Sequence, residues 1–340
     1  MINNEEDHMI TLLVVKQYIK NFISKYEVYL KPLFKMILAL ISLMMINGKI
    51  GYMHRLDNIS IVLIIALMCS FMPMNFIIFV AAAFIVLHLY ALSLECAAIA
   101  LVIFLVLFLL YFRFSPKDTI VVLLTPICFV LKIPYAVPLA MGLLGTPTSA
   151  ISVGCGVMVN YLISYFAESA TALSGMDAEE MTTKFRFIID GFLDNKDMML
   201  TIAAFAVTII LVYMIKRLSI DYAWTIAMIA GAITDVMILL IGDMVFDTNV
   251  SIVGIIIGTI FSVLIVKVVE FFAFHVDYSR VEKVQFEDDE YYYYVKAVPK
   301  IAVAKPAKTV KKITSQKKEA AQPPRTTGSV IRKSNKSGLK

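Results

Sequence analysis

Apolar residues fill most of the chain between residues 32 and 274, in long runs that short polar segments separate. A helix needs about 20 apolar residues to cross a hydrocarbon core of roughly 30 Å. Most runs approach this length, and they are apolar all round a helix rather than along the single stripe that a water-soluble protein uses. We therefore predict an all-α fold, a polytopic transmembrane helical bundle of about ten spans over residues 32–274. The expected spans are Pro32–Asn47, Asn58–Phe71, Asn75–Leu92, Cys96–Tyr111, Thr119–Phe129, Val137–Leu144, Ser149–Phe166, Met198–Ile215, Tyr222–Val245 and Ser251–Phe272.

The runs Thr119–Phe129 and Val137–Leu144 are too short to cross a bilayer alone. Prolines interrupt this region, and the sequence Gly145-Thr-Pro147 breaks the chain again before the next run. Two arrangements remain open for residues 119–166, either three crossings or a single crossing plus a re-entrant hairpin. Both arrangements place the flanking loops on the same sides of the membrane.

The first 31 residues form a different kind of helix. Lysines such as Lys16 and Lys20 alternate with apolar residues such as Ile19, Phe22 and Ile23 at a period near that of an α-helix. This pattern predicts an amphipathic helix over residues 1–31 that lies in the membrane interface. Pairing with a partner helix is the alternative.

Basic residues in short loops set the orientation of a membrane protein, because they stay on the cytoplasmic side. Arg113 with Lys117 and Lys216 with Arg217 mark two cytoplasmic loops, whereas the acidic loop 167–197 is predicted to be external and to contain a short helix. Both termini are then cytoplasmic. The same assignment places three basic residues outside, against the rule: Lys49, Arg55 and Lys132.

The composition agrees with a membrane protein. Of the 340 residues, 60% are hydrophobic and 17% are charged, whereas soluble domains are about half apolar and a quarter charged. No phosphate-binding loop, dinucleotide-binding glycine motif or catalytic triad is present. The four cysteines have no metal-ligand spacing. We therefore expect no enzymatic activity, no cofactor and no bound metal.

Asp235 stands near the middle of the apolar run Tyr222–Val245. A carboxylate at the centre of a span costs about 2.5–3.5 kcal/mol on insertion scales, so such residues usually face the bundle interior or a watery cavity. One interpretation is a proton, cation or substrate site on a transport pathway. The alternative is a structural aspartate that is protonated or hydrogen-bonded to a neighbouring hydroxyl such as that of Thr234.

The break around Gly145 and Pro147 is a second candidate region. Backbone groups freed at membrane depth must be satisfied by protein or water, so broken helices tend to line cavities. Asn160 is a strongly polar residue in the span that follows. We take Gly145, Pro147 and Asn160, together with Asp235, as candidates for the pathway. The alternatives are an ordinary turn between two spans and, for Asn160, a hydrogen bond between helices.

Three other features of the spans concern packing. Gly254 and Gly258 form a small-xxx-small face for close helix contact, within the chain or between copies. Lys267 and Glu270, three residues apart, are predicted to pair. His88 lies alone in an apolar run, which favours a satisfied interior histidine over a metal ligand.

The segment 275–298 is acidic and rich in tyrosine, and it is predicted to be cytoplasmic and β-like, since tyrosine suits a half-buried strand. The acidic run before Tyr291, Tyr292, Tyr293 and Tyr294 also has the composition of tails that tyrosine kinases modify, so these tyrosines are candidate modification sites. Residues 299–340 contain no aromatic residue and are strongly basic. They are predicted to form a disordered tail that is attracted to anionic lipid.

A transporter or permease-like component is the function we expect, with no substrate indicated. The alternative is a membrane scaffold or regulator whose cytoplasmic tail recruits partners. Expected partners are the lipid bilayer, anionic lipid, and either a second copy of the chain or a separate cytoplasmic protein. Nucleic acid is not expected, because the tail lacks interleaved aromatic residues. The usage of lysine, isoleucine and methionine, together with the absence of a targeting peptide, predicts the plasma membrane of a bacterium.

Overall fold

The computed structural model describes residues 2–175, 181–248, 251–274, 282–287 and 292–297. The chain divides into two compact units, Met1–Asp277 and Tyr278–Lys340. Residues 275–281 and 298–340, which include the whole predicted basic tail 299–340, lie outside the described residues.

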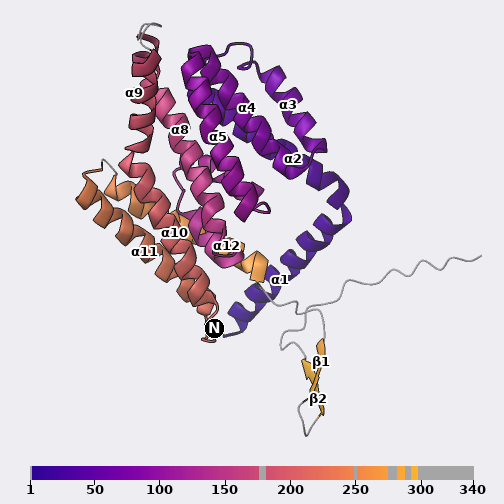
Figure 1. Ribbon diagram of the computed structural model, residues 1–340. Helices are drawn as coiled ribbons and strands as arrows, with labels where there is room; N and C mark the ends of the chain where they lie inside the picture. The colour runs from indigo at the N-terminus through magenta and orange to yellow at the C-terminus, as the bar shows by residue number, and fades with distance from the viewer. Residues whose placement is uncertain (1, 176–180, 249–250, 275–281, 288–291, 298–340) are drawn as a thin grey trace, which may run out of the picture. The chain divides into compact units, whose positions relative to one another are not determined.

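The described part of the first unit is built from α-helices (Figure 1). The helices are α1 Ile2–Lys25, α2 Glu27–Ile50, α3 Ile59–Phe71, α4 Met74–Leu92, α5 Leu94–Phe114, α6 Thr119–Val130, α7 Ala136–Leu144, α8 Ser149–Gly175, α9 Met181–Leu193, α10 Lys196–Lys216, α11 Ala223–Phe246 and α12 Ile252–Phe274.

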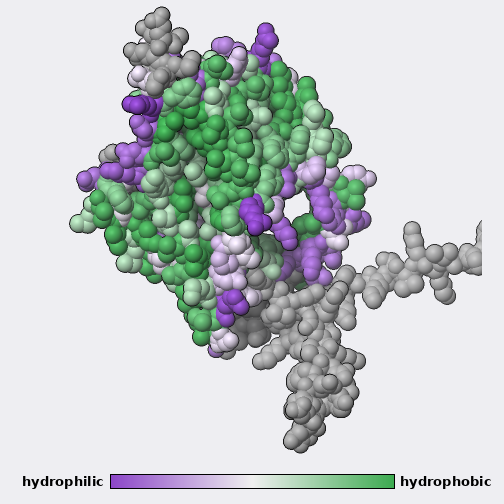
Figure 2. All heavy atoms as spheres, viewed as in Figure 1, coloured by the Kyte–Doolittle hydropathy of each residue, from purple (hydrophilic) through white to green (hydrophobic). Residues whose placement is uncertain are grey.

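Seven helices among the described residues are long and apolar enough to cross a membrane: α2, α4, α5, α8, α10, α11 and α12. Many of their large apolar side chains are exposed, among them Leu101, Val102 and Leu105 on α5, and Figure 2 shows hydrophobic residues over most of the visible face. An apolar surface of this extent fits a protein that lipid surrounds. The prediction of ten spans is not confirmed, because α3, α6 and α7 are shorter.

The first helical break lies at Tyr26 and not between residues 31 and 32, where the sequence placed it. Pro32 lies inside α2, because the helix has already begun before it. The amides of Tyr29 and Leu30 donate to the Tyr26 carbonyl. Figure 1 shows α1 as an arm that leaves the start of α2 and runs back below α12 in this view, where Lys16 Nζ donates to the Phe271 carbonyl at 3.1 Å.

Helix α3 runs antiparallel to α2. At one end, the Asn47 side-chain amide donates to the Leu56 carbonyl at 3.0 Å. At the other end, Ser70 Oγ donates to the Pro32 carbonyl at 2.9 Å, and Lys35 Nζ donates to the Met72 carbonyl at 2.9 Å. The 13 residues of α3 therefore cover the same depth as the central part of α2.

Helices α6 and α7 form a hairpin that returns to the end of the bundle where it began. The loop before α6 contacts the loop after α7, because Ser115 Oγ donates to the Thr148 carbonyl at 3.0 Å. With 12 and 9 residues, the two arms are about 18 and 14 Å long at 1.5 Å per residue, less than a bilayer core. Of the two arrangements that the sequence left open, this geometry favours the re-entrant hairpin.

The region 167–197, expected to be an external loop, is mostly helical. Helix α8 continues to Gly175, nine residues beyond the predicted end at Phe166. Helix α9 follows, and its residues Ile188 and Phe192 are buried with Leu173 of α8. The predicted short helix is present and packs against α5 and α8, which explains why the chain stays ordered as helix despite its acidic sequence.

The second unit contains two described strands, β1 Glu282–Glu287 and β2 Tyr292–Ala297. They pair antiparallel, with Glu282 opposite Ala297 and Glu287 opposite Tyr292. The acidic and tyrosine-rich segment thus contains a β-hairpin.

Candidate functional site

Asp235 lies in the middle of α11 and is fully buried. Thr208 on α10 donates a hydrogen bond from Oγ1 to Asp235 Oδ1 at 3.3 Å. The other carboxylate oxygen, Oδ2, is buried without a hydrogen-bond partner among the described residues. Thr234, the partner considered from the sequence, instead bonds to the Ala230 carbonyl of its own helix at 2.8 Å, because adjacent helical residues point in different directions.

Glycines bring the helices around Asp235 close together. A Cβ on Gly231, one turn before Asp235, would lie 2.2 Å from Val212 of α10 and 3.0 Å from Leu139 of α7. A Cβ on Gly142 of α7 would lie 2.6 Å from the same Val212. Asp235 therefore lies in a seam where α7, α10 and α11 pack tightly.

The tip of the α6–α7 hairpin reaches this seam. Tyr135, at the start of α7, has its ring edge-to-face with Phe205 of α10, with centroids 6.3 Å apart, and it lies within electrostatic range of the Asp235 carboxylate. Lys132 at the tip has a φ of 62°, a left-handed conformation that lets the chain reverse over few residues. The tip thus packs against α10, and its Tyr135 lies within electrostatic range of a buried carboxylate.

Helix α12 covers the other side of the tip. A Cβ on Gly258 would lie 2.8 Å from the Tyr135 ring and 3.1 Å from the Lys132 carbonyl, so only glycine fits there without displacing the hairpin. Gly254, one turn earlier, is exposed, and a Cβ there meets only Ser251 at 3.4 Å. Of the predicted glycine pair, Gly258 makes the close contact within the chain.

Other buried hydroxyls lack partners in the described part of the chain. Thr259 Oγ1 and Ser262 Oγ on α12, and Ser152 Oγ on α8, are buried without a hydrogen bond. Thr259 also lines a cavity of about 420 Å³ between α11 and α12, whose remaining lining is apolar. These three hydroxyls and Asp235 Oδ2 are the buried polar side-chain atoms without a partner in the described part of the chain.

Asn160 does not join Asp235. Its Oδ1 accepts a hydrogen bond from Lys49 Nζ of α2 at 3.4 Å, and the same Nζ donates to Ser164 Oγ at 3.1 Å. Lys49 is also within electrostatic range of Lys132 at the hairpin tip. Asn160 therefore belongs to a contact between α2 and α8, next to a pair of lysines.

Gly145 and Pro147 lie at the opposite end of α7 from Tyr135. Lys216 Nζ, at the end of α10, donates to the carbonyls of Leu143 at 2.8 Å and Gly145 at 3.0 Å. A cation at a helix C-terminus satisfies its free carbonyls and interacts favourably with the dipole. Pro147 is exposed in the turn to α8. The four predicted pathway residues thus occupy three separate places.

Three residues of these contacts were not predicted from the sequence: Thr208, Tyr135 and Lys216. Thr208 is one of several hydroxyls in apolar runs, and nothing in the sequence pairs it with Asp235. From the sequence, Lys216 indicates only a cytoplasmic loop at the end of a span. A signal was available for Tyr135, since it lies between Pro134 and Pro138 in the interrupted region.

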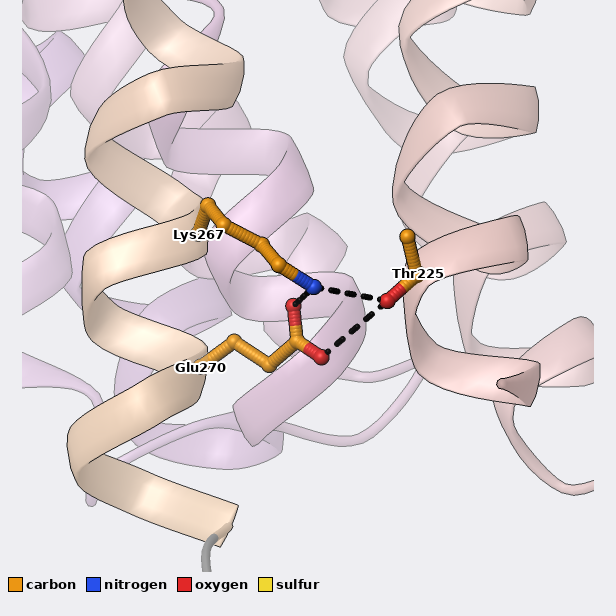
Figure 3. A network of polar contacts seen from close by, with 3 residues as sticks. All are labelled: Thr225, Lys267 and Glu270. Atoms are coloured by element: carbon orange, nitrogen blue, oxygen red, sulfur yellow. Dashed lines mark hydrogen bonds and ion pairs between the residues drawn. The ribbon is translucent and has the colours of Figure 1, made fainter. Parts of the chain in front are cut away.

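The predicted pair Lys267–Glu270 is confirmed, with Lys267 Nζ 2.9 Å from Glu270 Oε2. Thr225 of α11 joins it, accepting from Lys267 at 2.7 Å and donating to Glu270 at 3.4 Å (Figure 3). These contacts fasten the start of α11 to the end of α12.

His88 is fully buried and has a partner on each ring nitrogen. The Met53 amide donates to Nδ1 at 3.2 Å, so Nε2 carries the proton and donates to Asn47 Oδ1 at 2.9 Å. The histidine holds α4 against the end of α2. No group of three or more potential metal ligands occurs among the described residues.

Tyr291 lies outside the described residues, and Tyr292, Tyr293 and Tyr294 form part of β2. Comparisons with protein-family models, curated proteins and solved structures found no match for the chain.

Proposed function

We propose that this chain is a transport protein of the bacterial plasma membrane, in which a proton or small cation binds at Asp235. One observation carries the proposal: Asp235 is a buried carboxylate in the seam of α7, α10 and α11, and it keeps one oxygen without a partner in the described residues, with Tyr135 of the hairpin tip within electrostatic range. Non-helical backbone at membrane depth is tolerated where protein buries it or where it lines a watery cavity. Ionisable residues inside membrane proteins commonly mark ion pathways.

The proposal includes a topology. With Arg113, Lys117, Lys216 and Arg217 on the cytoplasmic side, α6 enters from the cytoplasm and α7 returns to it. Helix α3 then crosses together with the seven long helices, and both termini are cytoplasmic. The chain crosses the membrane an even number of times, and the hairpin accounts for the two short apolar runs that cannot span alone.

The proposed ion is bound by Asp235 Oδ2 together with the Thr208 hydroxyl, which already contacts Oδ1. Binding of a proton or cation would remove the cost of a bare carboxylate in this seam. The chain is proposed to carry no catalytic activity and to use no cofactor.

The test is ion flux into liposomes that contain the purified full-length protein and a pH-sensitive dye, with imposed proton, Na⁺ and K⁺ gradients. Wild-type protein is expected to conduct or exchange at least one of these ions, and Asp235→Asn is expected to abolish the flux. Asp243→Asn is the matched control, because Asp243 lies on the same helix but is half-exposed and bonded to Thr248. Flux no greater than in protein-free liposomes, or equal flux in Asp235→Asn, would contradict the proposal.

A scaffold or regulator is the second candidate, and the separation of Tyr278–Lys340 as its own unit favours it. Removal of residues 278–340 distinguishes the two functions. The transport proposal expects the shortened chain to keep its ion flux, whereas a scaffold would lose its cellular function while Asp235→Asn leaves that function intact.

A further inference from the structure

A groove of about 970 Å³ separates the N-terminal arm, formed by α1 and the first part of α2, from the ends of other helices. Figure 2 shows a gap between this arm and the remaining helices, with hydrophilic residues beside it. Four lysines line the groove, Lys16, Lys20, Lys31 and Lys35, and Glu27 is the acidic residue among the described residues of the lining. The lining therefore carries a net charge of +3, from four positive and one negative side chain.

Two of the lysines are held in place by neutral partners. Lys16 Nζ donates to the Phe271 carbonyl near the end of α12 at 3.1 Å, and Lys35 Nζ donates to the Met72 carbonyl before α4 at 2.9 Å. These carbonyls orient the two ammonium groups. Lys31 pairs with Glu27 at 2.5 Å. The formal charge of the lining remains positive after this pair is counted.

The walls between these charges are apolar. Ile19, Ile23 and Phe34 line the side of the arm, and Ile120 and Phe272 line the side of α6 and α12. The side chains of Ile23 and Phe34 are about half exposed, at 51% and 51%. Burying them would be favourable at roughly 25 cal/mol for each Å² removed from water.

We propose that this groove binds one anionic glycerophospholipid, with its phosphate among the lysines and its acyl chains along the apolar walls. Charge complementarity selects the ligand, because an anionic headgroup offsets the net positive charge and neutral lipid does not. A free phosphate ion leaves the apolar walls uncovered. This site belongs to the arm and is distinct from the basic tail, and it does not depend on the transport proposal.

The experiment uses the full-length protein in detergent and native mass spectrometry with added phosphatidylglycerol or phosphatidylcholine. The arm variant changes Lys16, Lys20, Lys31 and Lys35 to glutamine. The matched control removes the same charge from the tail by changing Lys311, Lys312, Lys317 and Lys318 to glutamine.

Wild-type protein and the tail variant are expected to retain phosphatidylglycerol in preference to phosphatidylcholine. In the arm variant, the apparent Kd for phosphatidylglycerol should rise roughly tenfold or more, since each lysine near an anionic group contributes about a factor of five. An unchanged preference in the arm variant, or an equal loss in the tail variant, would overturn the proposal.

Two further measurements separate a lipid site from a simple anion site. Soluble glycerol phosphate is expected not to displace phosphatidylglycerol, and displacement by it would overturn the role of the acyl chains. The double variant Ile19→Ser with Ile23→Ser keeps every lysine and is expected to weaken phosphatidylglycerol retention. Retention equal to wild type in this variant would also refute the site, and phosphatidylcholine binding reports whether each variant is folded.

Discussion

The position of the hairpin tip against α12 makes a sharp prediction at Gly258. A methyl group there would lie 2.8 Å from the Tyr135 ring and 3.1 Å from the Lys132 carbonyl, so Gly258→Ala must displace the tip. Overpacking of this kind typically costs about 1–3 kcal/mol. Alanine also gains about 1 kcal/mol over glycine inside a helix, and this gain offsets part of the cost.

Gly254→Ala supplies the matched control, since it makes the same change one turn away on the same helix, where the nearest atom is 3.4 Å distant. The propensity gain is common to both variants and cancels in the comparison. Gly258→Ala should therefore be less stable than Gly254→Ala by about 1–3 kcal/mol, which corresponds to roughly 2–12 °C in the unfolding midpoint.

The assay is thermal unfolding of the purified protein in detergent, followed by the fluorescence of Trp224, the single tryptophan. Equal midpoints for the two variants, or a higher midpoint for Gly258→Ala, would refute the placement of the tip beneath α12. The placement of Tyr135 within electrostatic range of Asp235 would then lose its support, because that placement depends on the Tyr135 ring lying against Gly258.

Three other outcomes follow from the geometry. Lys216→Met removes the cation from the α7 carbonyls and should lower stability by about 1–3 kcal/mol; an unchanged unfolding midpoint would show that water replaces it without cost. Alanine substitutions of Asn47 and His88 should be non-additive, with a coupling of about 1 kcal/mol in a double-mutant cycle, and simple additivity would argue against their hydrogen bond. Cysteines at Ser115 and Thr148 should cross-link under mild oxidation, detected by peptide mass spectrometry, because the loops before α6 and after α7 are in contact; absence of the cross-link would contradict that contact.

Much of the fold could be predicted from the sequence, because lipid imposes a length and an apolarity on each spanning helix. Each expected span coincides with a helix, and the boundaries differ by several residues at most, except at Phe166, where α8 continues to Gly175. That continuation was missed because the residues after Phe166 are small and polar and include Glu168, a loop signature by hydropathy, although Leu173 packs against α9.

The candidate site was predicted only in part. A lone carboxylate in an apolar run is visible without any structure, so Asp235 could be found. Its partner could not, since Thr208 lies on another helix and no spacing rule connects them. The same is true of Asn160, whose hydrogen bond to Lys49 joins residues 111 positions apart.

The sequence by itself determined that the chain is a membrane-embedded helical bundle. Apolar runs of this length are stable in lipid, and a helix satisfies their backbone hydrogen bonds there. Only the tertiary structure decided that α6 and α7 turn back as a hairpin and that its tip packs between α10 and α12. The physical reason is that hydropathy measures how each residue interacts with its solvent. Which helix end lies beside which is decided by close packing, at glycines such as Gly142, Gly231 and Gly258, between segments distant in the chain.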